Sequence, residues 1–63
     1  MINFCVQLVN LEEEYNYCFE DYYVALKFAF KSLEYKNSIK YVYIYSIINN
    51  EYNLLYRIIN YRN

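Results

Sequence analysis

Cysteines and carboxylates are the residues of this chain whose types could support chemistry. Cys5 and Cys18 do not form a C-x-x-C motif, and no cationic residue stands beside either of them to activate a thiol. Glu13 and Glu20 belong to surface segments without a recognisable pocket, so they do not suggest a catalytic acid–base pair. The chain contains no His and no Gly, which excludes imidazole chemistry and the glycine-rich loops that hold phosphates. We therefore expect no enzymatic activity, no metal ion, no cofactor and no small-molecule substrate.

Composition and charge restrict the partners and the compartment. The formal net charge is -1 and the 6 basic residues are scattered, so direct binding of nucleic acid is not expected. The first residues, MINFCVQLVN, lack the basic start of a signal peptide, and no apolar run reaches the ~18 residues of a membrane span. We expect a cytoplasmic protein whose two cysteines are reduced. The 63 residues should form a single domain, 1–63.

The second half of the chain predicts a helix followed by a β-hairpin. Residues 21–37, DYYVALKFAFKSLEYKN, carry apolar residues at helical spacing, with Asp21 as the N-cap and Asn37 at the expected end. Strands rich in Ile, Val and Tyr are predicted over about 39–48 and 53–61. Asn49 and Asn50 between them tolerate the left-handed conformation of a tight turn. The residues that we expect to be mostly buried are Leu26, Ala29, Phe30, Leu33, Tyr43 and Tyr56.

The segment EEEYNYCFE, residues 12–20, admits two interpretations. As a helix, it would continue into the next one and give a βαββ chain with one long helix over 11–36. As a strand, it would pair with a strand over residues 2–9 and place Phe4 opposite Phe19 and Cys5 opposite Cys18. Every opposed pair then matches in character, as cross-strand register requires. The pairing favours an α+β fold of order ββαββ, in which a four-stranded antiparallel sheet packs on one helix in two layers.

Both faces of the predicted hairpin are apolar, but one helix can cover only one face of a sheet. We expect the helix on the face that carries Tyr41, Tyr43, Tyr45, Leu54, Tyr56 and Ile58. The other face would then expose the predicted protein interface, which consists of Val42, Ile44, Leu55, Arg57 and Ile59. An apolar centre with a charged rim is typical of an interface, and Arg57 is the expected polar anchor. The alternative is that this face simply contacts water, as antiparallel sheets often do.

The order of strands and helix, with the segments FEDYYVALKFAFKSL, IKYVYIYS and LLYRIINY, resembles that of small accessory proteins of phages and mobile elements. Residues with AT-rich codons (Phe, Tyr, Met, Ile, Asn and Lys) make up 36 of 63 positions, as expected for such genomes. The resemblance extends over the whole chain in size, composition and pattern, without a diagnostic motif. Because such proteins include anti-CRISPR proteins, it implies an inhibitor that binds a host defence complex in the host cytoplasm. The alternative is a homo-oligomeric structural or regulatory module without a foreign target, such as a homodimer formed through the open face or a strand edge.

Overall fold

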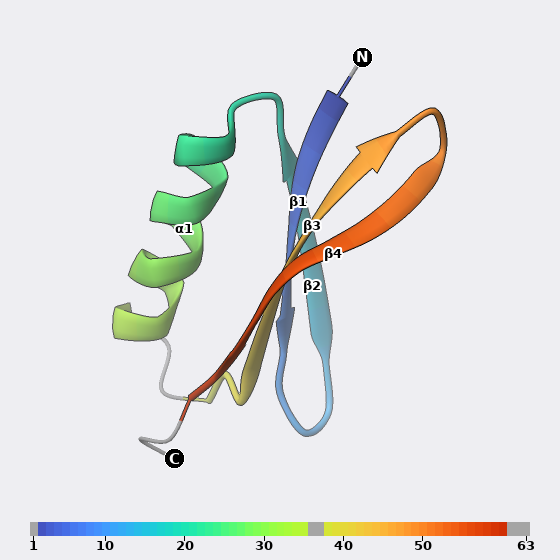
Figure 1. Ribbon diagram of the computed structural model, residues 1–63. Coiled ribbons are helices and arrows are strands. Elements are labelled where there is room, and N and C mark those ends of the chain that lie inside the picture. Colours follow the sequence, from blue (N-terminus) through green and yellow to red (C-terminus); the bar gives the residue numbers. More distant parts are fainter. Residues whose placement is uncertain (1, 36–37, 61–63) are drawn as a thin grey trace.

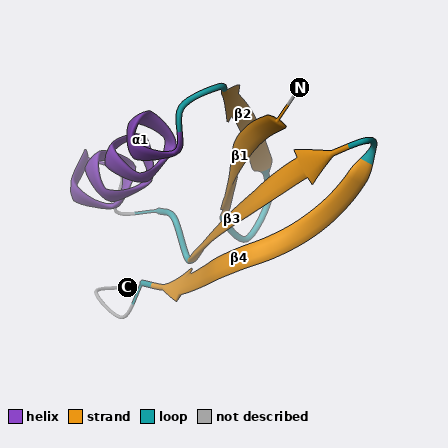
Figure 2. Cartoon of the chain, turned by 45° about the horizontal axis from the view of Figure 1, so that its top comes forward, coloured by secondary structure: helices purple, strands orange, loops and turns teal. Residues whose placement is uncertain are grey.

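The protein is a single sheet with one helix against it. The computed structural model describes residues 2–35 and 38–60, in the order β1 (Ile2–Val9), β2 (Glu14–Phe19), α1 (Tyr22–Tyr35), β3 (Tyr41–Ile48) and β4 (Glu51–Ile59) (Figure 1). The four strands form one antiparallel sheet in the order β2-β1-β3-β4, and α1 lies on one side of it (Figure 2). The predicted α+β fold of order ββαββ is therefore confirmed. No helix in the described part of the chain is long and apolar enough to cross a membrane.

The ambiguous segment 12–20 contains a strand, not the start of a long helix. Strand β2 pairs with β1 in the predicted register, with Phe4 opposite Phe19 and Cys5 opposite Cys18. The remaining predicted pairs are also formed: Val6 with Tyr17, Gln7 with Asn16, and Leu8 with Tyr15. The alternation of side chains thus fixes the register, because a slip by one residue would turn every apolar side chain of β2 to the polar face.

Local signals place the start of the helix and the hairpin turn. The Asp21 carboxylate accepts hydrogen bonds from the backbone N–H groups of Tyr23 and Val24, at 2.8 and 3.3 Å, as an N-cap does. Asn49 and Asn50 have φ values of 51° and 66°, the left-handed conformation that a two-residue hairpin turn requires. Both features agree with the sequence-based predictions. Asn37, the expected helix end, lies outside the described residues.

The core lies between α1 and the face of the sheet that the sequence analysis had left open. Val42 and Ile44 of β3 are fully buried, together with Val6 and Leu8 of the neighbouring strand β1. Tyr41, Tyr43 and Tyr45 instead point to the side away from the helix, so the predicted side for α1 is wrong. Two physical causes explain the choice. The central strand β1 carries its apolar side chains on the same face as Val42 and Ile44, and aliphatic side chains lose nothing when buried, whereas each tyrosine hydroxyl needs a polar partner.

A β-bulge at Leu55 changes which residues of β4 share a face. Tyr45 lies opposite Leu54, but the next residue of β3, Ile44, lies opposite Tyr56, so Leu55 has no partner on β3. A regular hairpin would place Tyr56 and Ile58 with the tyrosines of β3. The extra residue instead moves Tyr56 and Ile58 to the helix side and Arg57 and Ile59 to the opposite side.

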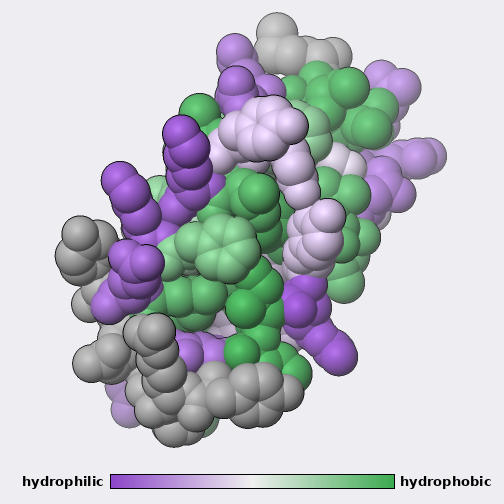
Figure 3. All heavy atoms as spheres, turned by 60° about the vertical axis from the view of Figure 1, so that its left-hand side comes forward, coloured by the Kyte–Doolittle hydropathy of each residue, from purple (hydrophilic) through white to green (hydrophobic). Residues whose placement is uncertain are grey.

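The helix side of the sheet is only partly covered. Helix α1 packs on β1, β2 and β3, and the predicted core residue Ala29 is buried while Leu26 and Leu33 are half-buried. Two other predicted core residues, Phe30 and Tyr56, are 51% and 52% exposed, because α1 does not extend over β4. Figure 3 shows apolar side chains reaching the surface across the middle of this side, with hydrophilic ones along its flank. On this side, a side-chain hydrogen bond with Tyr56 and, to a smaller extent, burial raise the pKa of the Tyr22 phenol.

Candidate protein-binding face

The side of the sheet opposite to α1 is the candidate functional surface, and we call it the open face. The strand pairings place fifteen side chains on it: Asn3, Cys5, Gln7 and Val9 of β1; Glu14, Asn16 and Cys18 of β2; Tyr41, Tyr43, Tyr45 and Ile47 of β3; and Tyr52, Leu54, Arg57 and Ile59 of β4. No helix covers this face in the described part of the chain (Figure 2). It divides into an aromatic half on β3 and β4 and a polar half on β1 and β2.

The aromatic half is built from paired tyrosine rings. Tyr41 and Tyr43 are stacked with ring centroids 6.3 Å apart, and Tyr45 contacts Tyr52 of the neighbouring strand at 5.6 Å. Tyr52 and its neighbour Leu54 are 69% and 61% exposed, respectively. A shallow depression of about 390 Å³ lies among these side chains and is lined by Gln7, Tyr43, Tyr45, Tyr52 and Leu54. Stiff aromatic side chains around a depression offer contact area at a small cost in side-chain entropy.

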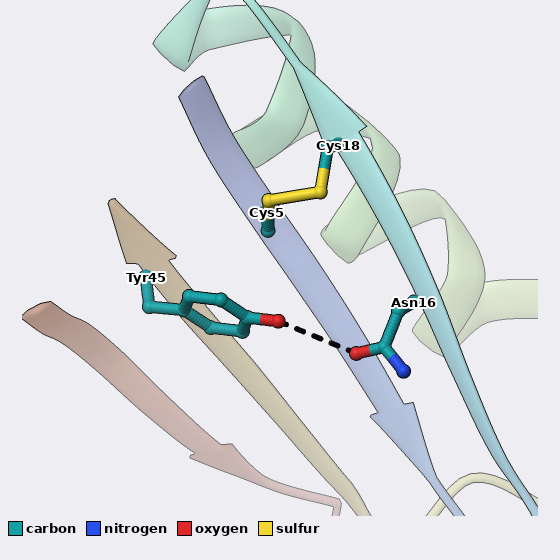
Figure 4. The surroundings of a disulfide bond; sticks show 4 residues. All are labelled: Cys5, Asn16, Cys18 and Tyr45. Atoms are coloured by element: carbon teal, nitrogen blue, oxygen red, sulfur yellow. Dashed lines mark hydrogen bonds between the residues drawn. A yellow bond between two sulfur atoms is a disulfide. The ribbon is translucent and has the colours of Figure 1, made fainter. Parts of the chain in front are cut away.

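The polar half holds amides and one carboxylate in fixed positions. The Gln7 side-chain amide donates a hydrogen bond to the Glu14 carboxylate at 2.7 Å. The Tyr45 hydroxyl reaches across β1 and donates to the Asn16 side-chain oxygen at 3.4 Å (Figure 4). These contacts link the two halves of the open face and leave further donors and acceptors of the amides directed to solvent.

Partial burial affects the chemistry of Tyr45. Loss of solvent raises the pKa of the Tyr45 phenol above its ordinary value of 10.0, and the neighbouring Tyr52 and Glu14 add to the shift. A phenol whose pKa is higher in the folded chain than in the unfolded chain favours folding only while it is protonated. Its contribution is therefore complete below about pH 10 and is lost as the pH rises through the folded-state pKa.

We expect the protein to lose stability above about pH 10, and the Tyr45→Phe variant to lose less of it. Phenylalanine keeps the ring but has no hydroxyl proton to release, so ionisation at position 45 cannot destabilise the folded variant at high pH. Urea unfolding of both proteins at about pH 8 and about pH 11 measures the difference. An equal loss of stability in the two proteins would contradict this role of Tyr45.

A disulfide bond lies on the same face, between β1 and β2. Cys5 and Cys18 are joined, with their Cα atoms 4.0 Å apart, beside the Tyr45–Asn16 contact (Figure 4). Cys5 is fully buried and Cys18 is exposed. The predicted juxtaposition of the two residues is confirmed, but the expectation that both thiols are reduced is wrong for this structure. Disulfides persist mainly in oxidising compartments, so the bond and the expected cytoplasmic location point in different directions.

The structure separates the five residues of the predicted interface. Val42 and Ile44 are fully buried beneath α1 and cannot contact a partner, which corrects their assignment. Arg57 and Ile59 are exposed on the open face, but they share it with Tyr43 and Tyr41 and not with Val42 and Ile44 as predicted. Leu55 is 40% exposed at the bulge. The position of the β3 tyrosines on the side away from α1 was not predicted from the sequence. Their alternation with Val42 and Ile44 carried the signal, since the hydroxyl-bearing side chains belong on the wet side.

A second depression, of about 570 Å³, lies at the turn between β1 and β2 and is lined by Asn10, Leu11, Glu12, Glu13, Tyr15, Ser38 and Lys40. The Asn10 side-chain oxygen accepts hydrogen bonds from the backbone N–H groups of Glu12 and Glu13 at 3.0 and 2.6 Å, which accounts for the shape of this turn. The Tyr15 hydroxyl donates to the Glu13 carboxylate. Among the described residues, no group of three His, Cys, Asp or Glu side chains is placed to hold a metal ion.

Comparisons of the chain with protein-family models, with curated proteins and with solved structures find no match.

Proposed function

We propose that this chain is a non-enzymatic protein-binding module that contacts its partner through the open face. The observation that carries the proposal is the aromatic half of that face: Tyr43, Tyr45, Tyr52 and Leu54 line a depression, Tyr41 stacks on Tyr43, and the only helix of the described chain does not cover them. Aromatic side chains with a polar end are enriched at protein interfaces because they bury large area and still satisfy a hydrogen bond.

The distribution of polar groups supports a protein partner. Gln7, Asn16 and Glu14 form one rim of the aromatic half, and Arg57 adds a cation on the other side. An apolar centre with a polar rim is the usual anatomy of a protein interface. Arg57 is the single cationic side chain among the fifteen of the open face, which is too little positive charge for a phosphate backbone.

The most specific form of the proposal is a small inhibitor that blocks a host defence complex by occupying its surface. Support for this form comes from the size, composition and element pattern that the chain shares with accessory proteins of phages and mobile elements. The second candidate is a homo-oligomeric module without a foreign target. A specific observation favours self-association as well, namely the exposure of eight of the nine residues of the edge strand β4.

Truncation of one tyrosine tests the open face. We expect Tyr52→Ala to weaken binding of the partner about tenfold or more, as loss of a central aromatic anchor does. Tyr23→Ala is the matched control, because Tyr23 lies on α1, is 71% exposed against 69% for Tyr52, and also contacts one neighbouring tyrosine ring. Immobilised wild type and both variants are incubated with lysate of the host cells in which the gene is expressed, and retained proteins are quantified by mass spectrometry.

A partner retained by wild type and by Tyr23→Ala, but lost with Tyr52→Ala, would support the proposal. Equal retention by all three proteins would move the binding site away from the open face. Circular dichroism of both variants controls for folding, since neither ring belongs to the buried core.

A further inference from the structure

Among the described residues, strand β4 forms a long edge of the sheet that no other segment pairs with. It is the last strand in the order β2-β1-β3-β4, it has 9 residues, and eight of them are exposed. Its exposed side chains include Tyr52, Leu54, Leu55, Tyr56 and Ile59. Soluble proteins usually protect such edges with charges, prolines or short strands, because unpaired backbone groups invite another strand. Here the edge carries two charged residues, Glu51 and Arg57, and no proline.

The turn geometry shows which backbone groups of β4 point outward. Ile48 and Glu51 flank the two-residue turn and therefore form a hydrogen-bonded pair, so the next residue, Tyr52, directs its N–H and C=O away from β3. The same holds for Leu54. Beyond the bulge, the alternation between backbone groups that face β3 and groups that face outward shifts by one residue. The even-numbered residues now face β3, as the hydrogen bond from the Asn60 N–H to the Lys40 C=O at 2.9 Å shows. Arg57 and Ile59 are thus the outward residues of the second half.

The four outward residues are also the four residues of β4 on the open face. We propose that β4 pairs antiparallel with β4 of a second copy of this chain, about a two-fold axis between Leu55 and Tyr56. In this register Leu54 lies opposite Arg57 of the second copy, and Tyr52 lies opposite Ile59 of the second copy. All four outward residues then meet outward residues, and each open-face side chain meets an open-face side chain, as an antiparallel ladder requires.

The charges of β4 are compatible with this self-pairing. Glu51 meets Asn60 of the second copy and Arg57 meets Leu54, so no like charges are opposed. Each copy uses the same strand, β4, for the contact. Such a symmetric contact closes into a two-fold dimer and leaves no free β4 edge to which a third copy could add. The two sheets join into one, and their open faces become continuous.

The exposed area is of the size that a dimer needs. Tyr52, Leu54, Leu55, Tyr56 and Ile59 are each 37% to 69% exposed. With ~150–250 Å² for a fully exposed large side chain, these five expose on the order of 400–650 Å². That is near the upper end of the apolar patches found on monomers and about half to four-fifths of the ~800 Å² that each partner contributes to a standard interface. Backbone pairing and the neighbouring side chains of β4 supply further contact area.

Charge substitution at Leu54 tests both the pairing and its register. Leu54→Lys places a cation opposite Arg57 of the second copy, whereas Leu54→Glu places an anion there; in the monomer both substitutions lie at the same 61% exposed position. Because the two-fold axis repeats each contact, we expect the dimer dissociation constants of the two variants to differ by about tenfold or more, with Leu54→Lys the weaker. The double variant Leu54→Lys/Arg57→Glu should recover the dimer.

Sedimentation equilibrium of the purified full chain measures these constants, and circular dichroism confirms that each variant folds. A wild-type protein that remains monomeric up to about millimolar concentration would overturn the proposal, since a dimer with a weaker dissociation constant would not be populated at the concentrations of a cell. Equal weakening by Leu54→Lys and Leu54→Glu, or failure of the double variant to recover, would also overturn it. The experiment needs no foreign partner, so its outcome is independent of whether the open face binds a target.

Discussion

The Ile44→Ala variant is expected to unfold with a free energy about 2–5 kcal/mol below that of wild type. Ile44 is fully buried between α1 and the sheet, opposite Val6 of β1 and Tyr56 of β4. Its truncation removes buried methyl groups and leaves a cavity that a small core cannot close. A loss of this size approaches the whole stability of a 63-residue domain. Urea unfolding followed by circular dichroism measures it.

Ile59→Ala is the matched control for Ile44→Ala. Ile59 lies on the neighbouring strand β4 and belongs to the open face, where it is 37% exposed. Its truncation should cost less than about 1 kcal/mol, since less apolar area leaves the protein interior. Similar losses in the two variants would show that both faces of the hairpin are core. A larger loss for Ile59→Ala would place the helix on the side that the sequence analysis had expected.

Reduction of the Cys5–Cys18 disulfide is expected to lower the free energy of unfolding by about 3 kcal/mol. The bond joins residues separated by 13 positions, and closing a loop of this length removes chain entropy from the unfolded state. It also ties the edge strand β2, whose residues Glu14–Cys18 are all exposed, to the central strand β1. Thermal unfolding of the oxidised protein with and without dithiothreitol measures the effect.

The Cys5→Ala/Cys18→Ala variant controls for effects of the reductant itself. Its melting temperature should not change when dithiothreitol is added, and it should lie below that of the oxidised wild type. If reduction left the wild-type melting temperature unchanged, the sheet would hold β2 without the disulfide. Titration of free thiols before and after reduction reports how many molecules carry the bond.

The order of the elements was predictable because local rules determine them. Asp21 caps a helix by accepting backbone hydrogen bonds within two and three residues, and Asn49-Asn50 adopts the left-handed turn by its own conformational preference. The pairing of β1 with β2 also follows from the sequence. Apolar and polar residues alternate on both strands, and one register matches all of them, including Cys5 with Cys18.

The interface prediction failed in part because a hairpin considered alone has two apolar faces. The face that receives the helix was decided by β1, which pairs with β3 and presents Val6 and Leu8 beside Ile44 and Val42. This pairing joins strands that are distant in the sequence, so it could not be predicted from the alternation of residues in β3 and β4 alone. No Gly or Pro near Leu55 predicts the bulge from the sequence. The bulge nevertheless moved Tyr56 to the helix side and Arg57 to the open face.

The sequence by itself determined the strands, the helix, the turn and the register of β1 with β2, because these depend on contacts between near neighbours and on side-chain alternation. Only the tertiary structure decided which apolar face became core, which residues of β4 share it, and that the tyrosines of β3 remain at the surface. The physical reason is that one helix can bury one face. The aliphatic side chains of three strands gain more from that burial than tyrosines, whose hydroxyl groups keep their hydrogen bonds when they stay in water.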